Sequence, residues 1–407
     1  MAWHLRNQMN IFIVTKEPFP TGLAATNRIR AYAKGFIEHG SRVTILCLGP
    51  TEYHHTVFNP HPSGIVDGIR FRYAGGKTRI SPYFLRRRID NAIGTLRACI
   101  HVWVKKPQVV IYYSSSTTPA LLLYGITRLR KILFLKEESE LPVVYARTMP
   151  RLRKMLFERV HYTLFDGMLL MTRRLINYFT KEKGMESPYL RVPMTVDCER
   201  FTLVKRTPSP PYIAYCGALN NRKDGVDVLI DAFVRIAPRF PDLSLYLIGD
   251  SASPEELAGY GQKIRDHGLE NRVIFTGRVG NDVIPVLLCN AVALVLARPE
   301  SIQAEGGFPT KLGEYLATGN PVVVTRVGEI PDYLTDGTNA FVAEPGSSSS
   351  LAGKLCEVLS DYPRAREVGL KGSRTAFTEF NYKTQAGNVL NFINSFPYVR
   401  HHRSDIF

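Results

Sequence analysis

Residues 298–325 read RPESIQAEGGFPTKLGEYLATGNPVVVT, and the fold is most readily recognised from this stretch. Its pattern predicts a loop over 298–309, a helix that opens at Thr310, a tight turn over 319–321 and a buried strand over 322–325. A buried strand is also predicted just before the loop. Strand, loop, helix and strand in this order are typical of a parallel α/β sheet.

The entrance to the predicted helix has the features of an anion-binding site. Thr310 is expected to be the N-cap, and Pro309 before it favours an extended entry. The free N–H groups of the first turn attract anions, and Gly306 and Gly307 allow a ligand close to the backbone. Glu314, one turn later, can accept hydrogen bonds from sugar hydroxyls. Two interpretations stay open here: a nucleotide-sugar site, or an ordinary strand-to-helix loop.

Composition indicates a globular protein of about two domains. The 407 residues are 45% hydrophobic and 22% charged, so a large core is available. The six cysteines show no C-x-x-C spacing, and we expect them to be reduced in a cytoplasmic protein. The sequence shows no apolar run long enough for a membrane span and no typical signal peptide at its start.

Positive charge is concentrated in the first half of the chain. Residues 1–205 hold 32 Lys+Arg and 14 Asp+Glu, a net of +18, whereas residues 206–407 hold 20 and 22, a net of −2. This asymmetry predicts an anionic partner of the first half, namely a membrane surface, a lipid phosphate or nucleic acid, or else a solvated basic face. Nucleic acid ranks last because no nucleic-acid-binding motif is visible.

Strands and helices alternate almost throughout, which predicts parallel sheets covered on both faces. Residues 196–211 lack periodicity and contain TPSPP, so we expect a linker between two α/β domains there. Residues 49–67 and 137–142 are expected to be loops. Two such domains would bind a ligand where the carboxyl ends of both sheets face each other.

One segment, 83–106, reads YFLRRRIDNAIGTLRACIHVWVKK and has two interpretations. Its apolar positions repeat at helical spacing, and arginines and lysines flank them. The first interpretation is a helix whose apolar face meets the core and whose basic end is solvated. The second is a contact with a membrane surface. The apolar positions are Phe84, Leu85, Ile89, Ile93, Leu96, Ile100 and Trp103.

Five stretches in order resemble one known family. They are PTGLAATNR up to Arg28, VPMTVDCERF over 192–201, YCGALNNRKDGVDVLIDAF over 215–233, VIFTGRV over 273–279, and the opening stretch. Together they are similar to the retaining glycosyltransferases of the GT-B fold, known as glycosyl transferases group 1 or glycosyltransferase family 4. The resemblance covers most of the chain.

The resemblance implies an α/β fold of two Rossmann-like domains that face each other across a cleft. It places an acceptor-binding domain at residues 1–200 and a nucleotide-sugar-binding domain at 201–382. A C-terminal helix and tail, 383–407, would return toward the first domain.

The resemblance also implies a set of donor-site residues. Lys223 matches the lysine that binds the diphosphate, and Arg222 beside it supplements or replaces an arginine missing at Ala218. Glu314 matches the glutamate that holds the ribose. Its usual partner glutamate is replaced by Gly306, so Glu305, one position earlier, is the candidate for contacting the sugar. The remaining donor-binding candidates are Gly22, Leu23, Gly217, Arg278, Val279, Gly307, Phe308, Pro309, Thr310, Lys311 and Leu312.

On the acceptor side, Arg28 is a candidate for binding a phosphate, although an arginine that faces solvent is the alternative. Glu137 and Glu138 stand where relatives carry a histidine. Glu137 is the candidate catalytic carboxylate and Glu138 an acceptor contact. The alternative for both is a helix cap or an ion pair with an arginine. No histidine spacing suits a metal, and we expect neither a metal nor a cofactor.

The function implied is transfer of a sugar, with retention, from a UDP- or GDP-linked donor to a glycan or lipid-linked glycan hydroxyl. The basic first domain would bring the enzyme to the inner face of the cytoplasmic membrane as a peripheral protein. Two rivals remain: a GT-B nucleotide-sugar epimerase, and a non-catalytic subunit that binds a sugar nucleotide.

Overall fold

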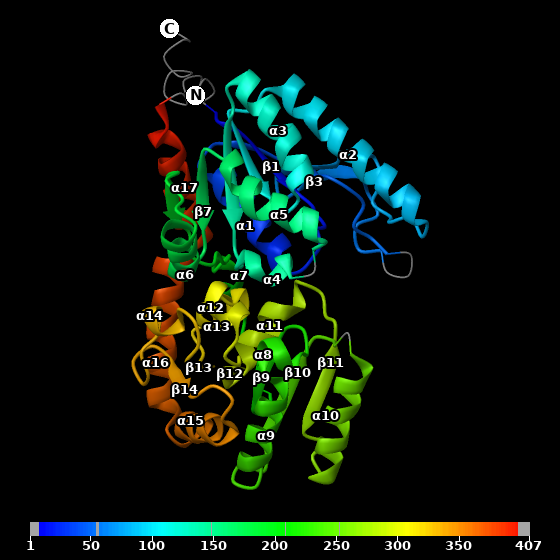
Figure 1. Ribbon diagram of the computed structural model, residues 1–407. Coiled ribbons are helices and arrows are strands. Elements are labelled where there is room, and N and C mark those ends of the chain that lie inside the picture. The colour runs from blue at the N-terminus through cyan, green and yellow to red at the C-terminus, as the bar shows by residue number, and fades with distance from the viewer. Residues whose placement is uncertain (1–7, 54–56, 148, 208, 252, 398–407) are drawn as a thin grey trace. The chain divides into compact units, whose positions relative to one another are not determined.

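The computed structural model describes residues 8–53, 57–147, 149–207, 209–251 and 253–397. The chain forms two compact units (Figure 1). Unit 1 comprises residues 1–195 and 382–407, and unit 2 comprises residues 196–381. The boundaries expected from the sequence, after residues 200 and 382, lie within a few residues of these.

Unit 1 is built on an eight-stranded sheet in the order β3-β4-β2-β1-β5-β6-β7-β8, parallel except for the β3–β4 pair. Its strands are β1 (Asn10–Thr15), β2 (Arg42–Cys47), β3 (Ser63–Val66), β4 (Ile69–Tyr73), β5 (Val109–Tyr113), β6 (Leu133–Glu138), β7 (Gly167–Leu170) and β8 (Tyr189–Arg191). Its helices are α1 (Ala24–Glu38), α2 (Phe84–Lys105), α3 (Thr117–Arg130), α4 (Pro142–Ala146), α5 (Arg151–Val160), α6 (Arg173–Asn177) and α17 (Tyr382–Ser395).

Alternation along β1 divides the core of unit 1 into two layers, because successive side chains of a strand point to opposite faces. Ile11 and Ile13 belong to the cluster that includes residues of α1 and α17. Phe12 and Val14 belong to the cluster that includes residues of α2 and α3. Helices therefore cover both faces of the sheet, as the alternating pattern predicted.

Unit 2 is built on a six-stranded parallel sheet in the order β11-β10-β9-β12-β13-β14. Its strands are β9 (Tyr212–Cys216), β10 (Ser244–Ile248), β11 (Val273–Gly277), β12 (Ala293–Leu296), β13 (Val322–Thr325) and β14 (Phe341–Ala343). Its helices are α7 (Glu199–Thr202), α8 (Asn221–Asp224), α9 (Val226–Ile236), α10 (Pro254–Asp266), α11 (Val283–Asn290), α12 (Ile302–Gly306), α13 (Thr310–Ala317), α14 (Ile330–Tyr333), α15 (Ser348–Ser360) and α16 (Tyr362–Thr375).

Several predicted loops contain regular structure. The loop expected over 49–67 includes β3, the linker expected over 196–211 includes α7, and the loop expected over 298–309 includes α12. Ser301 makes α12 possible, since its hydroxyl caps the helix by accepting from the N–H of Ala304 at 3.1 Å. Short polar segments of this kind carry too little periodicity to reveal a single helical turn or a short edge strand.

Helix α2 has the predicted spacing, but the opposite face meets the core. All seven of the predicted core-facing apolar side chains are exposed. The buried residues are instead Asp90, Gly94, Thr95, Ala98, Cys99 and Val102. The interpretation of a core-facing apolar stripe is therefore wrong. Gly94 explains the reversal: a Cβ there would lie 1.9 Å from the carbonyl oxygen of Leu48, so a small face lets the helix approach the sheet closely.

Candidate functional site

The start of α13 is anchored by a buried charged group that the sequence did not reveal. The Lys311 Nζ lies 2.8 Å from Asp224 Oδ2 and 2.8 Å from the hydroxyl of Tyr215. That hydroxyl is 2.9 Å from the same carboxylate oxygen. Burial lowers the pKa of Lys311, whereas the Asp224 carboxylate opposes this shift. Lys311 was predicted as a donor-binding residue, and its side chain instead ties α13 to β9 and α8.

Gly217 is required where β9 ends because Lys311 passes close to it. A Cβ at Gly217 would lie 2.3 Å from Lys311 Nζ and 2.8 Å from the Tyr215 hydroxyl. The predicted donor-binding glycine and the predicted donor-binding lysine are therefore brought together at the carboxyl end of β9. In parallel α/β sheets this edge is where ligands bind.

Helix α8 presents the two predicted catalytic cations. Asn220 caps it by accepting from the N–H of Lys223 at 2.9 Å. Gly225 ends it with a φ of +65°, and a Cβ there would lie 2.1 Å from the carbonyl oxygen of Ala297. Arg222 and Lys223 are both exposed. Lys223 directly precedes Asp224, whose carboxylate binds Lys311 Nζ, so α8 brings Lys223 to the same end of β9 as Lys311.

Glu314 lies one turn into α13, and Arg200 of α7 is 3.3 Å from its carboxylate. Arg200 also donates to the carbonyl oxygen of Asn281 at 2.7 Å. Burial raises the pKa of Glu314, and the positive charges of Arg200 and Lys311 oppose that rise. Arg200 was not predicted as a site residue, although it lies in VPMTVDCERF, one of the five stretches that resemble the family.

The loop before α13 differs from the expectation in two ways. Pro309 is the N-cap residue of α13, and Thr310 is already its first helical residue, with no side-chain cap. Thr310 as N-cap is therefore wrong. Phe308 is buried and packs against Tyr333 and Phe380, so only its backbone is available to a ligand.

Glu305 and Gly306 close the short helix α12. Glu305 is exposed and Gly306 is buried. The carboxylate that the sequence offered as a replacement is thus accessible to solvent. Arg278 and Val279 directly follow β11, and Arg278 is exposed.

In unit 1, the glycine loop after β1 forms a close turn. A Cβ at Gly22 would lie 2.0 Å from Thr26 Oγ1, which donates to the carbonyl oxygen of Pro18 at 2.7 Å. Leu23 is the N-cap residue of α1 and is exposed. Asn59 secures this loop by exchanging hydrogen bonds with the backbone of Thr21. Asn59 was not foreseen, because it stands in a segment without a recognisable pattern.

Arg28 and Glu137 form a buried ion pair. The Arg28 Nε lies 2.6 Å from Glu137 Oε1, and both side chains are 1% exposed. The other Arg28 nitrogens donate to the carbonyl oxygens of Val192 at 2.8 Å and Pro193 at 2.7 Å. The alternative interpretation, in which Arg28 faces solvent, is therefore wrong. This geometry also leaves neither charged group available to an acceptor, which corrects the phosphate-binding and catalytic expectations in favour of the ion-pair alternative.

Glu138 is also buried, 3.0 Å from Lys136 Nζ, and it accepts from the Tyr162 hydroxyl at 2.9 Å. Both glutamates belong to β6 rather than to the expected loop. The more accessible carboxylate at this edge is Glu17, two residues past the end of β1. Burial raises the pKa of Glu17, and the carboxylate of Glu140 raises it further. Its position directly after the first strand was the signal that could have found it.

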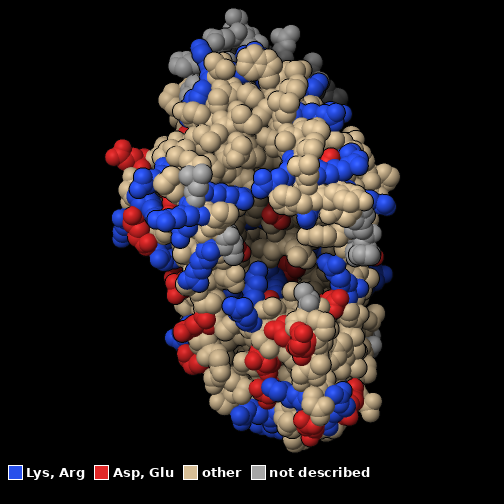
Figure 2. Space-filling model, turned by 45° about the vertical axis from the view of Figure 1, so that its right-hand side comes forward, with Lys and Arg blue, Asp and Glu red and all other residues tan. Residues whose placement is uncertain are grey.

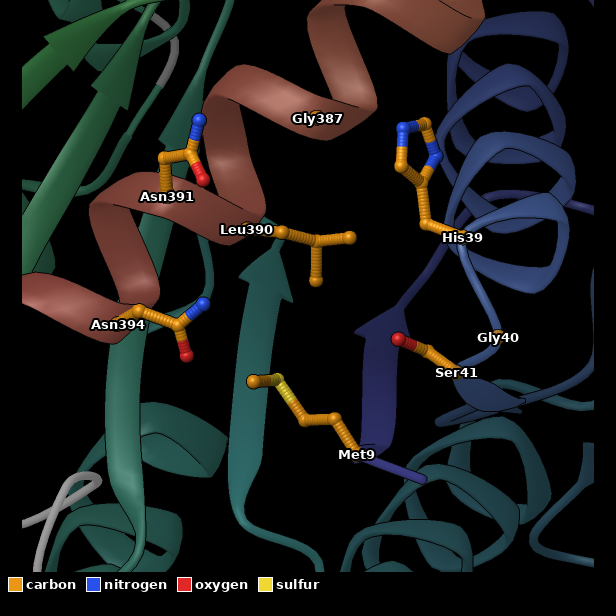
Figure 3. A pocket seen from close by; sticks show the side chains of 8 residues that line it. All are labelled: Met9, His39, Gly40, Ser41, Gly387, Leu390, Asn391 and Asn394. Atoms are coloured by element: carbon orange, nitrogen blue, oxygen red, sulfur yellow. The ribbon is translucent and has the colours of Figure 1, made fainter. Parts of the chain in front are cut away.

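A hollow of about 320 Å³ in unit 1 lies away from these residues (Figure 3). Met9 and Ser41, which line it, directly precede β1 and β2, so it sits at the amino ends of these strands. Figure 3 shows Leu390, Asn391 and Asn394 of α17 opposite them. This hollow does not coincide with the candidate site, which gathers at carboxyl ends.

Within the described ranges, no group of three or more His, Cys, Asp or Glu residues is placed to hold a metal ion. No helix in that part of the chain has both the length and the apolar character needed to cross a bilayer.

Residues 210–361 match the family model described as Glycosyl transferases group 1. The chain is 28% identical over 155 residues to the N-acetyl-alpha-D-glucosaminyl L-malate synthase of Bacillus anthracis, covering 38% of each chain. It is 25% identical over 248 residues to the GDP-mannose-dependent alpha-(1-6)-phosphatidylinositol monomannoside mannosyltransferase of Mycolicibacterium smegmatis, covering 56% of this chain and 62% of that one. The chain thus spans less than two thirds of each of these relatives.

Two solved structures are similar over nearly the whole chain. Sucrose-phosphate synthase from Thermosynechococcus elongatus has a TM-score of 0.72 at 16% identity, covering 95% of this chain and 99% of that one. Anabaena Alr3699/HepE in complex with UDP and glucose has a TM-score of 0.71 at 16% identity, covering 96% and 100%. At this identity the likeness concerns the fold, and it confirms the predicted α/β architecture with two parallel-sheet domains.

Proposed function

We propose that the chain, whose residues 210–361 match the family model described as Glycosyl transferases group 1, transfers a sugar from a nucleoside diphosphate donor to a hydroxyl of a glycan or lipid-linked glycan, with retention. In this reaction the bond from the anomeric carbon to the diphosphate oxygen breaks, a bond to the acceptor oxygen forms, and the proton of the acceptor hydroxyl passes to the departing diphosphate. The leaving diphosphate gains negative charge. A site for such a reaction needs cations at the diphosphate and a carboxylate at the ribose.

The observation that carries the proposal is the cluster at the carboxyl end of β9. Lys223 directly precedes Asp224, which binds Lys311, and Glu314 lies one helical turn after Lys311 in α13. Lys223 and Arg222 are exposed and can meet a diphosphate, whereas Lys311 is held by Asp224. The exposed cations would stabilise the developing charge, and Glu314 would accept from ribose hydroxyls, displacing Arg200 or sharing with it.

The donor is proposed to be UDP- or GDP-linked. UDP is named with the structurally similar Anabaena protein, and GDP-mannose with the relative from Mycolicibacterium smegmatis. Glu305, as an exposed carboxylate before α13, would contact the sugar. Neither Arg28 nor Glu137 has a part in this proposal because each neutralises the other inside unit 1.

We place the enzyme as a peripheral protein on the cytoplasmic face of an anionic membrane. Lysine and arginine side chains spread over the part of the surface formed by unit 1, with fewer acidic ones among them (Figure 2). An anionic leaflet attracts such a surface by about 1 kcal/mol for each cation close to it. A lipid-linked acceptor would then be met at the membrane.

Two substitutions test the donor site. Glu314→Ala removes the proposed ribose acceptor, so nucleotide affinity should fall roughly 10- to 100-fold, as expected for hydrogen bonds to a charged group. Lys223→Ala should leave the affinity for the intact nucleotide-sugar nearly unchanged and lower turnover by roughly 100-fold or more, since the cation acts on charge that develops as the diphosphate departs. Titration calorimetry with UDP and GDP measures the first effect, and transfer assays with a panel of UDP- and GDP-sugars measure the second.

Lys263→Ala serves as the control, because Lys263 forms only a partly exposed ion pair with Asp231. Unchanged nucleotide affinity in Glu314→Ala would falsify the ribose assignment. Full conversion of the donor to an epimer without acceptor would favour the epimerase. Nucleotide binding without transfer to any acceptor would favour the non-catalytic subunit.

A further inference from the structure

The outer face of α2 carries a row of large apolar side chains that the core does not use. We call this row the outer stripe and define it as Leu85, Ile89, Ile93, Leu96, Ile100 and Trp103. Its spacings of three and four residues place all six on one side of the helix. Leu85 is 68%, Leu96 60% and Ile100 53% exposed. Hydrophobic burial is the main favourable term in folding, so a row of this kind marks a contact surface.

The core side of α2 shows that this exposure is built into the packing. Gly94 and Ala98 form a small face, and the close approach of Gly94 to Leu48 leaves no room for a larger residue. Rotation of the helix to bury the outer stripe would therefore push large side chains against the sheet. Helix α2 is thus amphipathic, as its sequence indicates, but its large apolar side chains point away from the core of unit 1.

Charge around the outer stripe is entirely positive at the surface. Arg86, Arg87 and Arg88 are exposed at the start of α2, and Lys105 is exposed at its end. Asp90, the sole acidic residue of α2, is buried and lies 3.1 Å from Lys77 Nζ. The surface of this helix therefore offers apolar side chains and cations, with no exposed carboxylate among them.

Helix α3 extends this surface, since α2 and α3 are packed side by side (Figure 1). The Arg130 guanidinium lies over the ring of Trp103, 4.6 Å from its centroid. Leu122 and Leu129 of α3 are exposed as well. Arginines next to exposed leucines and a tryptophan are typical of a helix that lies in a membrane interface.

We propose that the outer stripe of α2 inserts into the interface of an anionic bilayer, with the helix parallel to the membrane plane and its arginines at lipid phosphates. The proposal rests on the membrane location included in the proposed function, but it does not depend on sugar transfer. The stripe runs about 27 Å along the helix axis, which gives acyl chains a long contact. A second copy of this face would bring like charges together, and nucleic acid would leave the stripe in water.

Vesicle flotation of the full chain tests the apolar part of the contact. With phosphatidylcholine vesicles that contain phosphatidylglycerol, the double change Leu96→Glu and Ile100→Glu should lower the partition coefficient roughly 100-fold. Two apolar side chains that would be buried in the bilayer are then replaced by charged ones. The matched control is Leu203→Glu with Leu370→Glu, two leucines of unit 2 that are 89% and 51% exposed. The control should bind like the unaltered protein.

The arginines are tested on the same vesicles. Changing Arg86, Arg87 and Arg88 together to glutamine should weaken binding roughly 100-fold at low salt and should reduce its salt dependence. The control changes Arg265, Lys371 and Arg374 of unit 2, all exposed, to glutamine. Weaker binding of equal size in both triple variants would show that total charge alone acts, which would overturn the proposal.

Insertion depth is read from Trp103, since the chain has only two tryptophans and Trp3→Phe leaves Trp103 alone. Its fluorescence should shift to shorter wavelength on anionic vesicles and should be quenched by lipids brominated near the headgroup end of the chain. Binding without any quenching, or binding that survives the double glutamate variant, would overturn the proposal. The proposal would also be overturned if the double glutamate variant bound RNA or an acidic polypeptide as well as the unaltered protein does, and if that ligand displaced the protein from vesicles.

Nucleotide binding without vesicles separates the two proposals. The α2 variants should keep the affinity for UDP or GDP of the unaltered protein, because α2 belongs to unit 1, whereas Arg222, Lys223 and Glu314 lie in unit 2. Loss of vesicle binding with intact nucleotide binding supports the outer stripe. Absence of nucleotide binding in the unaltered protein would instead contradict the proposed function and would not affect the proposal of a membrane contact.

Discussion

Lys311 illustrates how one charged side chain can hold a binding site in shape. Its Nζ is paired with Asp224, whose side chain is only 3% exposed, and the Tyr215 hydroxyl completes the group. A buried ion pair adds little net stability when intact, yet removing one partner leaves an uncompensated charge. The sequence placed Lys311 at a helix entrance correctly. It could not show that the lysine side chain turns to a carboxylate 87 residues earlier.

Asp224→Ala is therefore expected to destabilise unit 2 by about 3–5 kcal/mol, because Lys311 would be left buried without its counter-ion. Urea unfolding followed by circular dichroism measures the change. Glu344→Ala is the matched control, since Glu344 pairs with Arg326 at the surface and its removal should cost only about 0–1 kcal/mol. Equal costs for the two variants would contradict the structural role given to Asp224.

The same argument applies to Arg28 and Glu137, which are 109 residues apart in the chain. Both were predicted as acceptor-side residues through the family resemblance, Glu137 because relatives carry a histidine at its place. Their burial together turns two candidate functional groups into one structural pair. No local pattern distinguishes the two cases, because the partner is fixed by the neighbouring strands of the sheet.

Helix α2 shows that a correct periodicity can still be assigned to the wrong face. The prediction counted large apolar residues, and these repeat at helical spacing as expected. The packing surface is decided instead by size, because Gly94 allows the helix to approach β2 closely. A glycine within the helix was the signal in the sequence for this close contact.

Gly94→Ala is expected to destabilise the protein by about 1–3 kcal/mol, as for other overpacked contacts, since the added Cβ meets the Leu48 carbonyl. Gly125→Ala in α3 is the control, because a Cβ there meets nothing within 4 Å. That change should instead stabilise by about 0.5–1 kcal/mol through helix propensity. Thermal and urea unfolding compare the two. A stabilising Gly94→Ala would mean that α2 does not pack as described.

The chain crosses between its two units twice, after Thr195 and after Asn381. On its return, α17 packs against α1, and its residues Ala386, Val389 and Ile393 join the core of unit 1. Gly35 of α1 permits this contact, because a Cβ there would lie 2.5 Å from the Cβ of Ala386. The C-terminal helix, which the family resemblance predicted to return toward the first domain, thus contributes to the core of unit 1.

Truncation after Asn381 should therefore destabilise unit 1 and spare unit 2. Hydrogen exchange is the measurement: amides of α1 and β1 should lose protection, while those of β9 and β12 should keep it. Equal loss of protection in the two units would show that they do not unfold independently.

Local patterns in the sequence were sufficient for the strands, most helices, the strand-to-helix glycines and the position of Glu314, because these depend on residues close together in the chain. The resemblance of five stretches to a known family supplied the α/β fold with two parallel-sheet domains, which the similar structures confirm. Three features were decided only by the tertiary structure. They are the face of α2 that meets the core, the ion pair of Arg28 with Glu137, and the ion pair of Lys311 with Asp224. Each depends on how closely distant backbone segments approach, and that distance is fixed only when sheet and helices pack together.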